Sequence, residues 1–127
     1  MPALSGFHHV KLPVTDLDRS RRWYEEVLGL EVQIEFVEEG EVKGVALADA
    51  GGTLGLALRQ APERAGALAG FDPVALLVPT RDAVGSWRDH LDRLGQPHGG
   101  VVTGHRGGSV LVGLHDPDGV EIRLYAD

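Results

Sequence analysis

The sequence contains no cysteine, a single methionine and only 6% aromatic residues. Without cysteine, disulfides, thiolate catalysis and zinc knuckles are excluded, and a reducing cytoplasm is the expected compartment. No apolar run approaches the ~20 residues that a membrane span needs, and no secretory signal is evident. Twelve basic against nineteen acidic residues give a net charge of −7, which disfavours nucleic acid and anionic membranes as partners.

Glycine, in contrast, is abundant, with 18 residues in a chain of 127. The glycines are scattered without a period, which excludes collagen and low-complexity sequence and indicates many turns between short strands. The hydrophobic share of 43% and the charged share of 24% are those of a globular protein. We therefore expect a single domain over residues 1–127.

Two segments, residues 15–28 and 80–94, have the apolar periodicity of amphipathic helices. Thr15, followed by Asp18, predicts the start of the first helix, and Thr80 the start of the second. The inward positions have the same spacing in both, namely 17, 20, 24 and 27 against 84, 87, 91 and 94. Both helices are expected to stop at a Leu-Gly pair, at Gly29 and at Gly95.

Strands are predicted before and after each helix, separated by turn residues. The first set covers residues 7–14, 31–38, 42–48 and 53–59, and the second covers 74–78, 98–103, 109–114 and 120–125. The chain is thus a duplicated strand–helix–three-strand unit, with repeats at about 6–60 and 72–126 and a connector at 61–71. Such a duplication predicts that each copy buries apolar surface of the other.

The duplicated unit opens with HHVKLPVTDLDRSRRWYEEVLGL and closes with DPDGVEIRLY. These motifs resemble the vicinal oxygen chelate superfamily, which includes glyoxalase I, extradiol dioxygenases, and fosfomycin- and bleomycin-resistance proteins. The resemblance implies an α+β fold in which two tandem βαβββ units form a curled, cup-like mixed sheet with helices on the outside. It further implies a site on the concave side and a homodimer.

Enzymes of this family hold a divalent metal with His and Glu side chains from the first and last strands of each unit. The resemblance places His9 at the first of these positions, and Pro73 or, in a slipped alignment, Ala75 at its counterpart. The last-strand positions correspond to Arg123 and Leu56. A permanently cationic guanidinium repels a dication, so most ligand positions are lost and no metal or other cofactor is expected.

One alternative metal set remains. Glu121 lies two residues before Arg123 and therefore on the same face of its strand. Glu121 and His9, with Asp72 from another chain, are the fallback ligands for one divalent metal ion. An inward-facing Arg123 also needs a partner of its own, which Glu121 or an anionic or carbonyl ligand can supply.

We therefore expect a binding protein rather than an enzyme. It sequesters a small hydrophobic or aromatic natural product, as antibiotic-resistance and self-resistance proteins of the family do. The alternative is a glyoxalase- or dioxygenase-like enzyme with an atypical metal site or with His9 as a metal-free general base. No catalytic residue is assigned. The predicted ligand-binding residues are His9, Lys11, Phe36, Leu56, Leu58, His105, Arg123 and Tyr125.

The first repeat also contains many carboxylates, here called the acidic cluster. Its members are Glu25, Glu26, Glu31, Glu35, Glu38, Glu39 and Glu41. They are interpreted either as a solvated face or as an attractor for a cationic drug.

Overall fold

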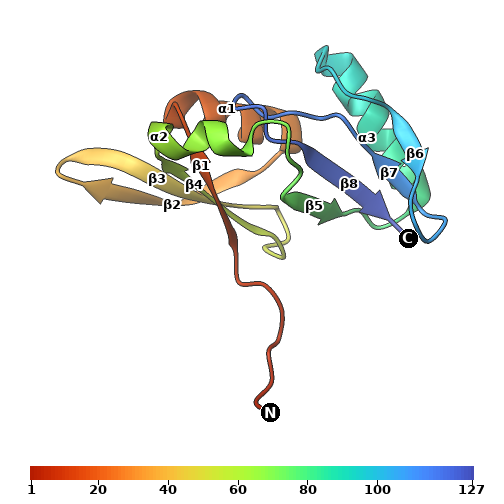
Figure 1. Cartoon of the computed structure of the whole chain (residues 1–127), viewed down its shortest axis with the longest axis horizontal. Coiled ribbons are helices and arrows are strands. Elements are labelled where there is room, and N and C mark those ends of the chain that lie inside the picture. The colour runs from red at the N-terminus through yellow and green to blue at the C-terminus, as the bar shows by residue number, and fades with distance from the viewer. The chain divides into compact units, whose positions relative to one another are not determined.

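The computed structural model describes all residues, 1–127, and divides into two compact units, Met1–Ala65 and Gly66–Asp127. The division falls within the predicted connector. Each unit has its own four-stranded mixed sheet and its own long helix. The tandem βαβββ organisation and the α+β class predicted from the sequence are therefore confirmed (Figure 1).

The first unit contains β1, α1, β2, β3, β4 and a one-turn helix α2. Their bounds are Val10–Val14, Leu17–Leu28, Glu31–Glu38, Glu41–Ala48, Gly55–Gln60 and Pro62–Ala65. The strand order is β1-β4-β3-β2, with β1 parallel to β4 and the other neighbours antiparallel. The helix α1 packs against β3 and β4, and Figure 1 shows it along one side of this sheet.

The second unit repeats this order with a 3₁₀ turn η1, then β5, α3, β6, β7 and β8. Their bounds are Gly66–Leu68, Val74–Leu77, Arg81–Leu94, Val101–Thr103, Ser109–Leu111 and Ile122–Ala126. The strand order β5-β8-β7-β6 matches that of the first sheet, again with a parallel first pair. The helix α3 packs against β6, β7 and β8.

The helix ends follow the expected capping chemistry with one exception. The first helix is capped by Asp16, whose carboxylate accepts a hydrogen bond from the Arg19 N–H at 3.1 Å, so the prediction of Thr15 is wrong. Both residue types cap well, and the backbone left extended at Asp16 decided between them. Thr80, where the second helix is predicted to start, is the N-cap of α3, and Gly29 and Gly95 end the helices in left-handed conformation.

The inward stripe of α3 is shorter than predicted. Val84 and Leu91 are buried, whereas Trp87 is half-buried and Leu94 is 50% exposed. Leu94 is the last residue before the Gly95 cap.

Several strands begin later or end earlier than the alternating pattern predicts. The first begins at Val10 rather than at residue 7. The sixth begins at Val101 and the seventh ends at Leu111, because Gly100 and Gly113 have positive φ angles, of 86° and 72°, and interrupt the ladder. The connector contains two short helical turns, α2 and η1.

Each unit has a separate core between its helix and its sheet. In the first unit the largest fully buried side chains include Leu58, Val45 and Tyr24, and in the second Leu91, Ile122 and Leu124. No helix is long and apolar enough to cross a bilayer.

Candidate functional site

The two faces of the first sheet differ in what covers them. Strand register places Leu58 beside Val45 on one face, where both are buried beneath α1. Because side chains alternate along a strand, Ala57 and Ala46, which are also paired, face the opposite side. The hollow of the first unit lies on that side, with Ala46 and Ala57 in its lining.

The hollow on this open face has a volume of about 470 Å³. It is lined by His8, His9, Lys11, Ile34, Phe36, Glu38, Gly44, Ala46, Leu47, Gly55, Leu56, Ala57, Leu58 and Arg59. Small residues of β3 and β4 form its floor, and Ile34 and Phe36 of β2 form an apolar wall, being 52% and 45% exposed. The volume lies within the range of small-molecule pockets.

The neighbours of Gly44 leave no room for a side chain at this position. A Cβ atom there would lie 2.9 Å from the Leu58 carbonyl oxygen and 3.7 Å from the Phe36 ring and the Arg59 side chain. The ring of Phe36 and the stem of Arg59 therefore approach the backbone at this point. A side chain at position 44 would collide with the Leu58 carbonyl of β4, whereas its contacts with Phe36 and Arg59 would be ordinary van der Waals contacts.

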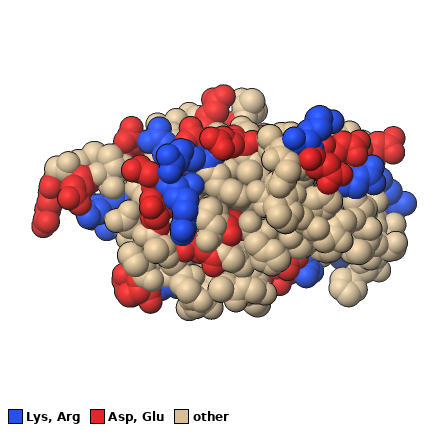
Figure 2. All heavy atoms as spheres, turned by 90° about the horizontal axis from the view of Figure 1, so that it is seen from above, with Lys and Arg blue, Asp and Glu red and all other residues tan.

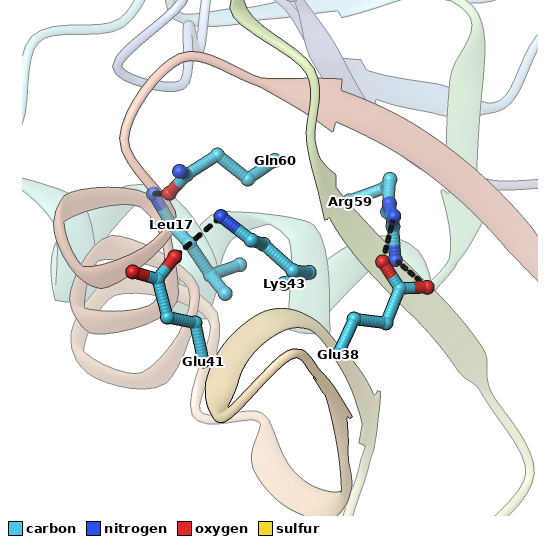
Figure 3. Close-up of polar contacts among 6 residues, drawn as sticks. All are labelled: Leu17, Glu38, Glu41, Lys43, Arg59 and Gln60. Carbon is cyan, nitrogen blue, oxygen red and sulfur yellow. Dashed lines mark hydrogen bonds and ion pairs between the residues drawn. The ribbon is translucent and has the colours of Figure 1, made fainter.

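Two polar pairs border the hollow. The Nδ1 atoms of His8 and His9 are 2.9 Å apart, so one ring donates a hydrogen bond to the other. The Arg59 guanidinium donates two hydrogen bonds to the Glu38 carboxylate, at 3.0 and 2.6 Å (Figure 3). The hydrogen bond from Arg59 lowers the pKa of Glu38, and the pKa of Arg59 is raised by the same pairing.

Leu56 and Leu58 border the hollow, but their side chains are only 2% and 1% exposed and belong to the core.

The register also revises the assignment of Leu56 as the counterpart of Arg123. In the second unit Arg123 of β8 pairs with Ala75 of β5. Lys11 occupies on β1 the position that Ala75 occupies on β5, and Lys11 pairs with Ala57 of β4. The counterpart of Arg123 is therefore Ala57, which likewise has no metal-binding atom.

In the second unit Arg123 lies between two carboxylates. Its Nε donates to Glu121 Oε2 at 2.8 Å, and its Nη1 lies 3.4 Å from Asp72 Oδ2. The same Glu121 oxygen accepts the Gly113 N–H at 3.0 Å. The pKa of Glu121 is lowered, first by the hydrogen bond from Arg123 and then by that from Gly113. The pKa of Arg123 is raised, chiefly by Glu121 and then by Tyr125.

The predicted ligand-binding residues thus fall into two groups, one in each unit. His9, Lys11, Phe36, Leu56 and Leu58 border the hollow of the first unit. His105, Arg123 and Tyr125 line a smaller depression of about 180 Å³ in the second.

Sequence reasoning missed several lining residues of the first unit, of which Ala46, Ala57 and Arg59 matter most. The signal available in the sequence was the alternation of side chains between the two faces of the strand at residues 55–60. Knowledge that Leu56 and Leu58 face the helix would have placed Ala57 and Arg59 in the hollow.

The side chains do not fit the divalent metal site of the family within either unit. No group of three or more His, Asp or Glu side chains is placed to hold one ion. Of the fallback ligands, His9 lies in the first unit and Glu121 in the second, and the Glu121 carboxylate is engaged by Arg123 and Gly113. Metal sites normally have at least three protein ligands.

Comparison with known proteins agrees with this fold. The Glyoxalase/Bleomycin resistance protein/Dioxygenase superfamily model matches residues 6–124. Since the match spans most of the chain, the protein belongs to this superfamily. No curated protein matched the sequence.

Solved structures of the same fold come from proteins of different activities. A glyoxylase/bleomycin resistance protein/dioxygenase domain from Frankia sp. EAN1pec is 23% identical, with a TM-score of 0.74, over 97% of this chain and 92% of that chain. A lactoylglutathione lyase from Agrobacterium tumefaciens is 18% identical, with a TM-score of 0.76, over 98% and 95%.

A fosfomycin resistance protein from Listeria monocytogenes, in complex with Mn(II) and sulfate, is 16% identical, with a TM-score of 0.71, over 98% and 94%. At these identities the likeness concerns the fold.

Proposed function

We propose that this protein binds a small hydrophobic or aromatic natural product and sequesters it, as an antibiotic-resistance protein does, without a catalytic metal. The observation that carries the proposal is the open hollow of about 470 Å³ in the first unit. Its floor is made of Gly44, Ala46 and Ala57, and its wall is made of Ile34 and Phe36.

The energetics of this surface favour an apolar ligand. Ile34 and Phe36 are about half exposed, which is costly for side chains of their size. A flat ligand that covers both removes apolar surface from water, at about 25 cal/mol per Å². The floor has no side chain longer than a methyl group, so a planar ring system can approach the sheet closely.

The family's ligand positions support binding over metal catalysis. Arg123 and Ala57 stand at the paired last-strand positions, and neither coordinates a metal. The carboxylate nearest to Arg123, that of Glu121, already accepts two hydrogen bonds. The residues at these positions therefore favour binding of the ligand by contact and shape.

Isothermal titration calorimetry with a panel of planar hydrophobic natural products tests the proposal. For a compound that binds, Phe36→Ala is expected to raise the Kd about tenfold, because a buried aromatic contact is lost. Val37→Ala is the matched control, since Val37 is the next residue, is 61% exposed and does not line the hollow. Trp23 and Trp87 do not line it either, so calorimetry is preferable to tryptophan fluorescence.

If no compound of a broad panel binds, or if the two variants weaken binding equally, the sequestration proposal is wrong.

A second candidate function is favoured by the position of His9. Its ring lines the same hollow, with Nδ1 2.9 Å from that of His8, so an imidazole is available there as a general base. Metal analysis of the purified protein tests the metal-dependent form of this alternative. One tightly held divalent ion per chain, lost in His9→Ala and retained in His98→Ala, would establish an atypical metal enzyme in place of the sequestration protein.

A further inference from the structure

The hollow of the first unit is lined by charged side chains as well as by its apolar floor. Apart from the histidines, its charged lining residues are Lys11, Glu38 and Arg59. Glu38 and Arg59 neutralise each other through two hydrogen bonds, as Figure 3 shows. Lys11 makes no ion pair or hydrogen bond. One uncompensated positive charge therefore borders the hollow of a chain whose net charge is −7.

Lys11 stands beside the small-residue floor. It pairs with Ala57 across the parallel β1–β4 ladder, and Ala57 pairs with Ala46 across β3–β4. Cation and floor thus form a continuous row across three strands. His9, two residues before Lys11, lines the same hollow. The Nδ1 atoms of His8 and His9 satisfy each other, which leaves Nε2 of both rings without a protein partner.

The opposite side of the floor is aromatic. The Phe36 ring lies 3.7 Å from the position that a Cβ atom of Gly44 would take. Gly44 pairs with Phe36 and also with Arg59, whose cation is held by Glu38. A ligand across the floor would therefore meet an apolar ring at β2 and a free ammonium group at β1.

We propose, resting on the proposed small-molecule binding, that the ligand of this hollow is an aromatic carboxylic acid. Its ring system lies on Ala46 and Ala57 against Phe36, and its carboxylate pairs with the Lys11 ammonium. Whichever of His8 and His9 accepts the hydrogen bond at Nδ1 has its N–H at Nε2, and that one N–H is available to the same carboxylate. Burying the ring and pairing the Lys11 ammonium use two features of the hollow, its exposed apolar wall and its exposed cation, that have no partner within the protein.

The acidic cluster does not favour a cationic ligand here. Of its members only Glu38 lines the hollow, and its carboxylate is taken by Arg59. On the face shown in Figure 2, acidic side chains gather at the end where the β2–β3 hairpin lies in Figure 1, interspersed with basic ones. Glu31, Glu35 and Glu39 are exposed and do not line the hollow, as expected of a solvated face.

The proposal is tested by calorimetry with three probes that share one ring system: 2-naphthoate, 2-naphthamide and 2-naphthylmethylammonium. We expect 2-naphthoate to bind about fivefold more tightly than the neutral amide at low salt, and the cation to bind most weakly. The preference of the anion over the amide should decrease as the ionic strength rises, because salt screens an exposed charge pair.

Lys11→Met and Lys43→Met form a matched pair of variants. Both remove one positive charge from the first sheet, but Lys43 is held by Glu41 at 2.6 Å and does not line the hollow (Figure 3). Lys11→Met should abolish the preference for 2-naphthoate, whereas Lys43→Met should preserve it. Both variants change partly exposed surface residues, and thermal unfolding verifies that they fold.

The outcomes separate this inference from the proposed function. Equal affinity for the acid and the amide, tightest binding of the cation, or equal effects of the two lysine variants would overturn the acid specificity and leave sequestration intact. If none of the three probes binds and no compound of the wider panel binds either, both proposals fail.

Discussion

At the scale of single residues, the contacts of Glu121 show that one fallback metal ligand already has partners within the protein. Its carboxylate lies one residue before β8 and accepts hydrogen bonds from Arg123 at 2.8 Å and from the Gly113 N–H at 3.0 Å. Its side chain is 12% exposed, so both interactions occur where water competes little. The sequence left its partner open, and the structure identifies Arg123.

The lowered pKa of Glu121 makes this contribution depend on pH. Because the folded pKa lies below the ordinary value of 4.5, the ionised side chain stabilises the fold above that pH, and the contribution is lost as the pH falls through the folded pKa. We expect Glu121→Gln to lower the free energy of unfolding by about 2 kcal/mol at pH 7, and by less at pH 3. Urea unfolding at both pH values measures the difference.

Glu63→Gln is the control for this experiment, because Glu63 is exposed in α2 and its replacement should change stability little at either pH. A penalty for Glu121→Gln that is the same at pH 7 and pH 3 would contradict the assigned role of the charge.

At the scale of elements, the helix ends follow from local chemistry and could be predicted. Gly95 has a φ angle of 70° and donates its N–H to carbonyls of the last turn of α3, as Gly29 does for α1. Such caps depend on a few neighbouring residues, so the sequence suffices to find them. The strand faces could not be found in this way, because a shift of one residue exchanges the two faces of a strand.

Gly95→Ala tests the cap directly. A Cβ atom at this position meets no other atom within 4 Å, so the entire cost is the left-handed backbone. We expect the free energy of unfolding to fall by about 1 kcal/mol, measured from the urea midpoint. Gly66→Ala is the matched control, since Gly66 also has open space around it but no positive φ. Equal effects of the two substitutions would disprove the backbone explanation.

At the scale of the whole molecule, the duplication gives two units that each have a helix on one face of the sheet. The opposite faces retain exposed apolar side chains, among them Phe36 at 45% in the first unit and Leu77 at 81% in the second. Surfaces of this kind are candidates for association with ligands or with other chains.

We accordingly expect a homodimer in solution. Light scattering coupled to size-exclusion chromatography should give twice the chain mass of 13.6 kDa at micromolar concentration. A single-chain mass that persists across a concentration series would contradict this expectation.

The candidate site was predictable only in part. Phe36 and Lys11 are among the predicted ligand-binding residues and do line the hollow, whereas the sequence predicts no role for Ala57 and Arg59. Leu56 and Leu58 are predicted there because they lie on a strand that should line the cup, but their side chains belong to the core beneath α1. Hydrophobicity by itself does not distinguish a core face from a ligand-binding face.

The amino-acid sequence by itself determined the duplication, the helices with their glycine C-caps and the turns between strands, because these depend on short-range periodicity and on glycine's backbone freedom. The tertiary structure alone decided which strand residues face the helix and which face the hollow. It also decided that Arg59 and Arg123 are neutralised by Glu38 and Glu121 while Lys11 is not. Those outcomes depend on register and on contacts between distant strands, for which the local sequence has no signal.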